Sequence, residues 1–366
     1  SAAGGRSRAR TQARASSRLL RCATAQHGSH EPHPRTAGMG FVRFGGRRKT
    51  DRSRMPRVRA RVWYHARVPS FMIASRVSLM AMFRIGCAVW GYKDWVGDLF
   101  PPGSKSADFL SLYSRRLTTA EGNTTFYATP RSEIVRRWAA ETPETFRFCF
   151  KLPREVSHEG PLATKLKITR EFVERMAPLG ERLGPFFLQL PPGYRGDKIE
   201  DLERWISAWP SEYQLAVEVR HEDWYTEPHE SALINLLHQY NAGKVIMDVR
   251  PLDAGPLPGA DFDLQAARDR KPDVPMHPLR SSEIALVRYI GHPTPELNGP
   301  LLDDWAKRVA QWLADGTEVY FFCHCPDERQ SPGLCREFQR RLERMSDIPR
   351  LPWDELDTGM QQATLF

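Results

Sequence analysis

Residues 146–151 read Phe-Arg-Phe-Cys-Phe-Lys, and this stretch indicates the fold most clearly. Its three phenylalanines alternate with an arginine, a cysteine and a lysine, which is the two-residue period of a β-strand. In a barrel of parallel strands an aromatic face of this kind packs against surrounding helices, and the other face points into the barrel. The alternation therefore predicts a strand with Lys151 at its inner, carboxyl end.

From residue 82 onward, β-rich runs of similar length alternate with longer amphipathic runs. The predicted strands are 84–89, 118–123, 146–151, 186–190, 214–220, 244–249, 284–289 and 318–324. The predicted helices are 106–116, 131–141, 169–183, 197–209, 228–240, 262–270, 302–314 and 332–345. Eight such units in 285 residues predict a single-domain (β/α)8 TIM-type barrel. A doubly wound sheet is the alternative, but no Gly-rich nucleotide-binding motif follows any strand.

The segments outside this pattern differ in composition. Residues 1–81 hold 18 basic and two acidic residues, which leaves 35 basic and 42 acidic residues, a net charge of −7, in 82–366. We therefore expect a disordered Arg-rich leader, interpreted as a misplaced start rather than a targeting peptide. The barrel is assigned to 82–350 and a flexible tail to 351–366. Residues 251–278 are predicted to be a long loop on the active face, either a lid or a tolerated insertion.

Two further features of the sequence predict the cellular location of the protein. The most apolar window, residues 71–90, contains Arg76 and Arg84 and is too charged to span a membrane. Five of the six cysteines are scattered through the barrel region, which is typical of a reducing compartment. We therefore expect a cytoplasmic protein.

The strand phase also predicts where polar side chains meet. In the fifth strand it points Val217 and Val219 outward and Glu218 and Arg220 inward. Seven strands then deliver polar groups to one rim: Glu121, Asn123, Lys151, Gln189, Glu218, Arg220, Asp248, Arg288 and His324. Strand interiors rarely hold such groups unless they are paired or functional. We predict a functional site at the carboxyl end of the barrel, with a self-satisfied ion network as the alternative.

The residue types at this rim suit an anionic ligand. Lys151, Arg220 and Arg288 would hold a phosphate or carboxylate, with Asn123, Gln189, His324 and Trp90 as further binding residues. Glu121, Glu218 and Asp248 are candidates for general base, and His158 for a mobile acid or base. A divalent metal ion held by Glu121, Glu218, Asp248 and His221 is a second option, although no tight metal-ligand spacing is present.

Several of these residues also carry a family resemblance. The blocks Ile85-Gly-Cys-Ala-Val-Trp-Gly-Tyr92 and Glu121-Gly-Asn-Thr-Thr-Phe-Tyr127 are followed by Phe148-Cys-Phe-Lys-Leu-Pro153, Leu188-Gln-Leu-Pro-Pro192, Val217-Glu-Val-Arg-His221 and Asp248-Val-Arg250. In this order they resemble the domain of unknown function 72 family, which includes the YecE-like proteins. The resemblance implies a TIM-type barrel and supplies no activity. The eighth strand departs from many members, because it reads Phe322-Cys-His-Cys-Pro-Asp327 in place of an Asn-rich pattern.

The last residues suggest a partner. Gln362, Leu365 and Phe366 resemble the short peptide by which bacterial DNA-processing proteins dock on the sliding clamp. Three functional hypotheses follow. The first is a hydrolase acting on an anionic substrate, such as a phosphodiester or a nucleic-acid end. The second is a non-catalytic module of DNA metabolism that docks through this tail. The third is a sugar-active hydrolase that uses Glu121 and Glu218.

Overall fold

The computed structural model describes residues 83–254 and 264–356. Within these ranges, parallel strands form a closed barrel in the order β1 to β8, and β1 pairs with β8. The strands are β1 Phe83–Cys87, β2 Thr119–Gly122, β3 Arg147–Lys151, β4 Leu183–Gln189, β5 Leu215–Glu218, β6 Gly243–Asp248, β7 Ile284–Ile290 and β8 Glu318–His324. The predicted (β/α)8 barrel is confirmed.

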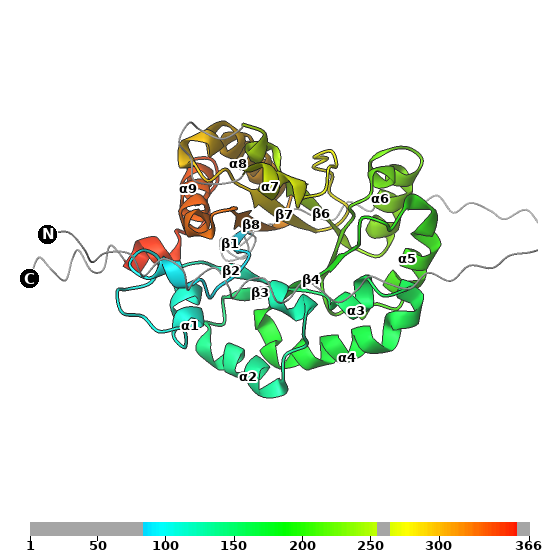
Figure 1. The fold of residues 1–366 in the computed structure, drawn as a ribbon, viewed down its shortest axis with the longest axis horizontal. Helices are drawn as coiled ribbons and strands as arrows, with labels where there is room; N and C mark the ends of the chain where they lie inside the picture. The colour runs from blue at the N-terminus through cyan, green and yellow to red at the C-terminus, as the bar shows by residue number, and fades with distance from the viewer. Residues whose placement is uncertain (1–82, 255–263, 357–366) are drawn as a thin grey trace, which may run out of the picture. The chain divides into compact units, whose positions relative to one another are not determined.

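The helices surround the ring of strands, as Figure 1 shows. They are α1 Phe109–Ser114, α2 Ser132–Glu141, α3 Arg154–Ser157, α4 Leu166–Met176, α5 Ile199–Ile206, α6 His229–Gln239, α7 Leu264–Asp269, α8 Gly299–Ala314 and α9 Ser331–Glu343. Short 3-10 helices lie at η2 Lys93–Trp95, η3 Asn123–Phe126, η4 Leu162–Lys165, η5 Ala177–Arg182, η6 Gly196–Lys198, η7 Glu222–Tyr225, η8 Arg250–Ala254, η9 Pro295–Asn298 and η10 Glu328–Gln330. Each predicted helix is found. The short α3 was not predicted, because four residues are too few for a helical period.

The aromatic alternation around β3 determines the packing of this part of the barrel. Phe148 and Phe150 are fully buried and stack on Trp138 of α2, with ring centroids 6.0 and 5.8 Å apart. Such large rings contribute much of the burial energy of a core. Gly122 in the adjacent strand leaves room for this layer, because a Cβ there would lie 2.3 Å from the Phe150 ring. The other face of β3 therefore points into the barrel, as the sequence predicts.

The inside of the barrel is filled by an apolar layer beneath the polar rim. Its members are Cys149, Phe187, Ala216, Val245, Leu286, Tyr320 and Phe322. These residues are almost fully buried, so the barrel centre is a packed core rather than a channel. Polar side chains two residues further along the strands lie directly on this apolar layer. Arg288, for example, lies over the ring of Phe187, with its Cζ 5.5 Å from the ring centroid.

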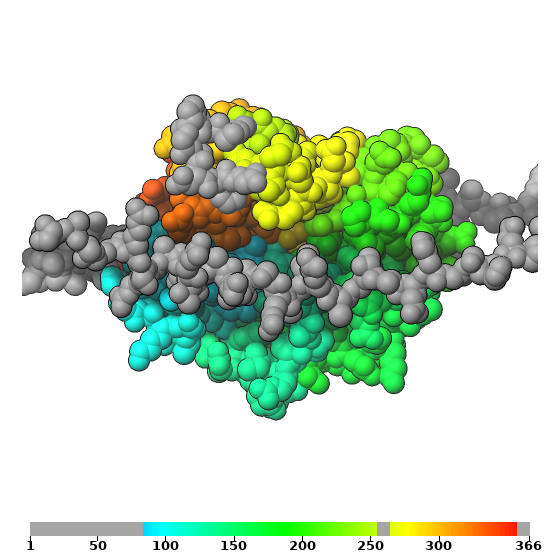
Figure 2. Space-filling model, viewed as in Figure 1, coloured from blue at the N-terminus to red at the C-terminus, as the bar shows by residue number. Residues whose placement is uncertain are grey.

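Two segments beyond the repeating units also pack against the barrel. The segment after α7 lies beside α6, where His277 Nδ1 is 2.7 Å from Glu230 Oε1; Figure 2 shows this segment in yellow next to the green α6. Leu351 and Trp353 are buried, and the Arg336 guanidinium lies over the Trp353 ring. The predicted tail boundary at residue 351 is therefore wrong, because folded contacts extend to at least residue 353. None of the helices in the two described ranges is long and apolar enough to cross a membrane.

Candidate functional site

A single arginine connects two carboxylates at the carboxyl end of the barrel. Arg288 of β7 donates through Nε and Nη2 to the Oε1 and Oε2 atoms of Glu121, at 2.8 and 3.1 Å. Its Nη1 donates to Glu218 Oε2 at 2.7 Å. Glu121 and Glu218 lie on β2 and β5, so this guanidinium connects strands that are separated around the ring. The predicted convergence of these three residues is confirmed.

Four further predicted residues form hydrogen bonds at or beside these two carboxylates. Arg220 donates to Glu218 Oε1 at 2.6 Å and to Gln189 Oε1 at 2.8 Å. Asn123 donates to Glu121 Oε2 at 2.8 Å, and His324 Nε2 lies 3.2 Å from Glu121 Oε1. Both carboxylates thus have partners on both oxygens. We call Glu121, Glu218, Arg220 and Arg288 the mouth network.

Burial and pairing act in opposite directions on the acids of the mouth network. Burial alone would raise the pKa of Glu121, but Arg288 and His324 hold the pKa of this carboxyl well below its usual range. Burial likewise opposes ionisation of Glu218, yet Arg220 and Arg288 lower its pKa to about 2. The same contacts raise the pKa of Arg288 against the effect of its burial. Both acids are therefore ionised near neutral pH.

Lys151 reaches the same mouth without an acid partner. Its side chain is 9% exposed, and its Nζ lies 3.8 Å from the centroid of the Phe126 ring. Among the described residues, no carboxylate forms an ion pair with it. Burial, together with the nearby positive charge of Arg288, lowers the pKa of Lys151 to about 8. Lys151 is thus a largely desolvated cation held by an aromatic ring.

Lys271 is a second lysine with a lowered pKa, which the sequence reasoning missed, and it is only partly buried. It follows α7, in the segment predicted to be a lid or an insertion. Burial lowers its pKa, as do the positive charges of Arg288 and Arg220, so Lys271 lies within electrostatic reach of the mouth network. In the part of the chain that the structure describes, it has no carboxylate ion-pair partner. Because Lys271 is far in sequence from the end of any strand, the strand pattern could not predict that it lies near the mouth.

His158 lies at the rim beside Lys151. Its ring packs edge-on against Phe126, with centroids 5.0 Å apart, and its Nδ1 is 2.7 Å from Ser157 Oγ. Burial and the charge of Lys151 lower the pKa of His158 to about 4. The imidazole is therefore neutral near pH 7.

Glu328, in η10 after β8, is another titratable group that the sequence reasoning did not identify. Its Oε2 accepts a hydrogen bond from Ser331 Oγ at 2.7 Å. Burial raises the pKa of Glu328 to about 7, and the negative charge of Glu121 adds to this effect while Lys271 opposes it. Its place directly after the eighth strand was the one available signal, since loops at this end carry functional groups in such barrels.

Asp248 does not belong to the mouth, contrary to prediction. Its carboxylate receives Nε and Nη2 of Arg250 at 2.9 and 2.8 Å, and the indole Nε1 of Trp305 in α8 at 2.7 Å. The interior cluster takes Val245 from β6, so residues of the opposite parity, including Asp248, face the helices. The predicted inward orientation of Asp248 is wrong because the phase of β6 is opposite to that assumed.

Two other predicted residues also lie apart from the mouth network. His221 Nδ1 accepts from the backbone N–H of Asp223 at 3.1 Å. Trp90 packs edge-on against Trp138 and Phe148, on the outer side of the barrel. The predicted metal ligands Glu121, Glu218, Asp248 and His221 therefore do not form one site. No other group of three or more His, Cys, Asp or Glu side chains suited to a metal ion occurs in the described ranges.

The proposed clamp-docking residues Gln362, Leu365 and Phe366 lie outside the described residues, as does the Arg-rich leader. The interpretations of these segments stay predictions.

Comparison with known proteins agrees with the fold and the blocks of sequence. Residues 84–356 match the family described as "Protein of unknown function DUF72". The chain is 33% identical over 290 residues to the UPF0759 protein YecE of Escherichia coli strain K12, covering 78% of this chain and all of that protein. It is 24% identical to the UPF0759 protein YunF of Bacillus subtilis over 256 residues, covering 65% of this chain and 87% of that protein.

Solved structures show the same fold. A DUF72 family protein of Thermotoga maritima superposes with a TM-score of 0.54 at 20% identity, covering 72% of this chain and 99% of that one. A DUF72 family protein of Enterococcus faecalis gives 0.54 at 19% identity, covering 72% and 96%. The chain belongs to the DUF72 family, and the predicted resemblance is confirmed.

Proposed function

We propose that this DUF72 protein binds an anionic group at its barrel mouth and hydrolyses the molecule that carries it. The observation that supports this proposal is a surplus of positive charge at the barrel mouth. Three buried or partly buried cations, Arg220, Arg288 and Lys151, face two ionised acids, Glu121 and Glu218, which leaves a net charge of +1. The two arginines are paired with the acids. The surplus therefore resides on Lys151.

A buried cation without a partner is costly, and a bound oxyanion removes this cost. Phosphate and carboxylate oxygens accept strong hydrogen bonds from ammonium and guanidinium groups. Arg220 uses Nε and Nη2 on Glu218 and Gln189, so its Nη1 is still able to donate. Lys151, Lys271 and Arg220 would thus hold the anion, while Glu121 and Glu218 fix the two arginines.

Hydrolysis also needs a group that exchanges protons near neutral pH. The mouth network does not supply it, because Glu121 and Glu218 stay ionised. This also disfavours the sugar-active alternative, in which one acid of such a pair must be protonated. Glu328, with a pKa of about 7, suits the role of general base toward water. Neutral His158, on the Lys151 side of the mouth, would orient the water or the leaving group.

Sulfate is the simplest probe for the binding step, because it keeps its charge across the neutral range. Calorimetric titration should show saturable binding to the wild type and about tenfold weaker binding to Lys151→Gln and Lys271→Gln, the loss expected for one charge-assisted hydrogen bond. Lys167→Gln is the matched control, since that lysine is 87% exposed on α4. Equal affinity in all four proteins would contradict the proposal.

The chemical step is tested separately with activated phosphodiester and carboxylate ester probes. Glu328→Gln should lower kcat about 100-fold with little change in KM, the usual effect of losing a general base. Sulfate binding without turnover of any probe would leave a ligand-binding module, which is the alternative function. Docking on a sliding clamp through the tail is tested by deleting residues 362–366 and measuring clamp binding.

A further inference from the structure

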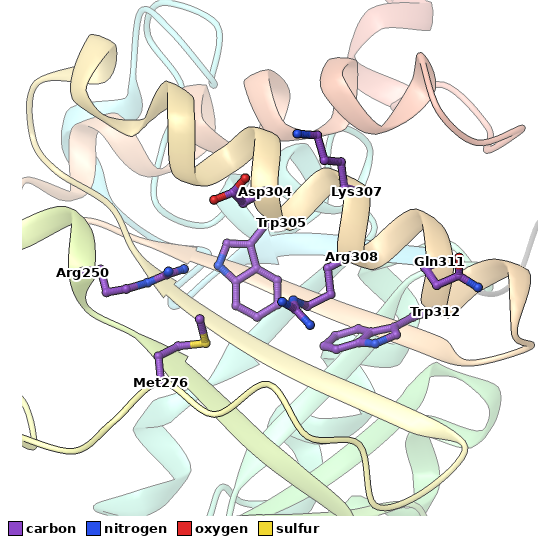
Figure 3. A pocket seen from close by; sticks show the side chains of 8 residues that line it. All are labelled: Arg250, Met276, Asp304, Trp305, Lys307, Arg308, Gln311 and Trp312. Carbon is purple, nitrogen blue, oxygen red and sulfur yellow. The ribbon is translucent and has the colours of Figure 1, made fainter.

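A pocket lies on the outer side of the barrel, between α8 and the end of β6. It has a volume of about 430 Å³, within the usual range for small-molecule sites. Trp305, Arg308 and Trp312 line it from α8, and Arg250 and Met276 face them from the barrel side, as Figure 3 shows. None of the mouth network residues contributes to it.

A fully buried carboxylate organises this pocket. Asp248 is 0% exposed, and it holds the Arg250 guanidinium through two hydrogen bonds and the Trp305 indole through a third. The planar guanidinium is therefore fixed in orientation, although its side chain is 39% exposed. Nη1 of Arg250 takes no part in the hydrogen bonds to Asp248, so it can donate to a ligand.

The charge of the pocket is positive. Arg250, Lys307 and Arg308 line it together with a single acid, Asp304. In the described part of the chain, Arg308 makes no ion pair, and Figure 3 shows its guanidinium beside the Trp305 indole. Trp305 and Trp312 pack edge to face, with centroids 6.0 Å apart. The pocket thus combines two arginines with the partly exposed thioether of Met276, above two indoles that are almost fully buried.

We infer that this pocket binds a second ligand, an oxyanion attached to a flat apolar ring. Arg250 and Arg308 would hold the phosphate or carboxylate oxygens, since a guanidinium matches both bidentately. The ring would lie against the partly exposed Met276 side chain, because a thioether packs favourably on an aromatic ring. The inference does not depend on the proposed function of the mouth. It also gives a role to the Asp-Val-Arg block at residues 248–250.

Phenylphosphonate tests the pocket, because its phosphorus–carbon bond resists hydrolysis at the mouth. In calorimetric titrations we expect Arg308→Gln and Arg250→Lys each to weaken its binding about tenfold. Arg250→Lys keeps the positive charge but loses the two-point contact with Asp248. It therefore distinguishes the effect of a fixed guanidinium orientation on binding from the effect of the charge alone. Inorganic phosphate should bind the wild type about fivefold more weakly than phenylphosphonate, because it buries no ring.

Two control variants locate the binding. Arg204→Gln removes an exposed arginine from α5 and should not change phenylphosphonate affinity by more than about twofold. Lys151→Gln should weaken only the phenylphosphonate that binds at the mouth, and the equivalent that depends on Arg308 should keep its affinity. Absence of saturable binding to the wild type would overturn the inference. Loss of binding in Lys151→Gln with full binding in Arg308→Gln would overturn it as well, because the ligand would then occupy the mouth.

Discussion

Two neighbouring strands end in the same local motif, an acid and an arginine separated by valine. In Glu218-Val-Arg220 after β5, the arginine Nε donates to the acid at 2.6 Å, and in Asp248-Val-Arg250 after β6 it does so at 2.9 Å. The first pair continues inward to Arg288, and the second continues outward to Trp305. The comparison teaches that the motif determines the pairing, whereas the phase of the strand determines which site the pair serves.

The two pairs also differ in their surroundings. Side chains of the inner pair are 2% and 18% exposed, and Arg288 ties them to a second buried acid. In the outer pair the acid is 0% exposed but its arginine is 39% exposed. Ion pairs gain strength and cost more to break as water is excluded. The inner pair should therefore matter more for stability.

The largest effect is expected when the centre of the inner network is removed. Arg288→Gln leaves Glu121 and Glu218 buried without their shared cation, and we expect the free energy of unfolding to fall by about 3–5 kcal/mol at pH 7. Urea denaturation measures this change. A loss below about 1 kcal/mol would show that solvent already reaches these acids.

The matching change in the outer pair should have a smaller effect. Asp248→Asn weakens the contacts with Arg250 and Trp305, and we expect a loss of about 2 kcal/mol of stability. Phenylphosphonate affinity should fall in this variant and sulfate binding at the mouth should not. A change in the sulfate affinity that depends on Lys151 would mean that the two sites are not separate.

Removing an unpaired cation should increase the free energy of unfolding instead of lowering it. Lys151→Met takes away a buried charge that has no carboxylate partner in the described ranges, so we expect about 1–2 kcal/mol of added stability at pH 7 and weaker sulfate binding. Thermal unfolding measures the first effect.

The stability gained in Lys151→Met should depend on pH. The pKa of Lys151 falls from 10.5 in the unfolded chain to about 8 in the folded protein. Between these values the unfolded chain binds more protons, so this group makes the wild type more stable as pH rises. The advantage of Lys151→Met should shrink across this window. An advantage that stays constant from pH 7 to 10 would contradict the assignment.

The smallest effect concerns sulfate affinity itself. Because the ligand needs the protonated amine, affinity should fall about fivefold from pH 8 to pH 9, as expected for one group with a pKa near 8. Guanidinium groups stay charged in this range and cannot produce the fall. Isothermal titrations in matched ionic strength measure it, and a flat profile would assign binding to the arginines alone.

Residues of β3 show what could be predicted from the sequence. Its aromatic and polar residues alternate strictly, so the phase and the position of Lys151 followed directly. In β6 both Val245, which faces inward, and Ile246, which faces the helices, are apolar, so alternation carries no information and Asp248 was misplaced. Its orientation depends on pairing with its neighbours.

Lys271 and Glu328 illustrate a different limit. Both lie in connecting segments, where no period relates a residue to the barrel axis, and only the path of the chain brings them to the mouth. Sequence reasoning therefore identified the paired charges on the strands. It missed a lysine and an acid that approach them from the loops.

The most direct test of the account is an NMR titration of the Lys151 side-chain amine, with and without sulfate. Lys151 should have a pKa of about 8 in the free protein, and this pKa should shift toward the usual lysine range once sulfate is bound, because the anion stabilises the charged amine. A Lys151 pKa that is unchanged by saturating sulfate would show that no anion binds beside this lysine, and the mouth would not be the site proposed.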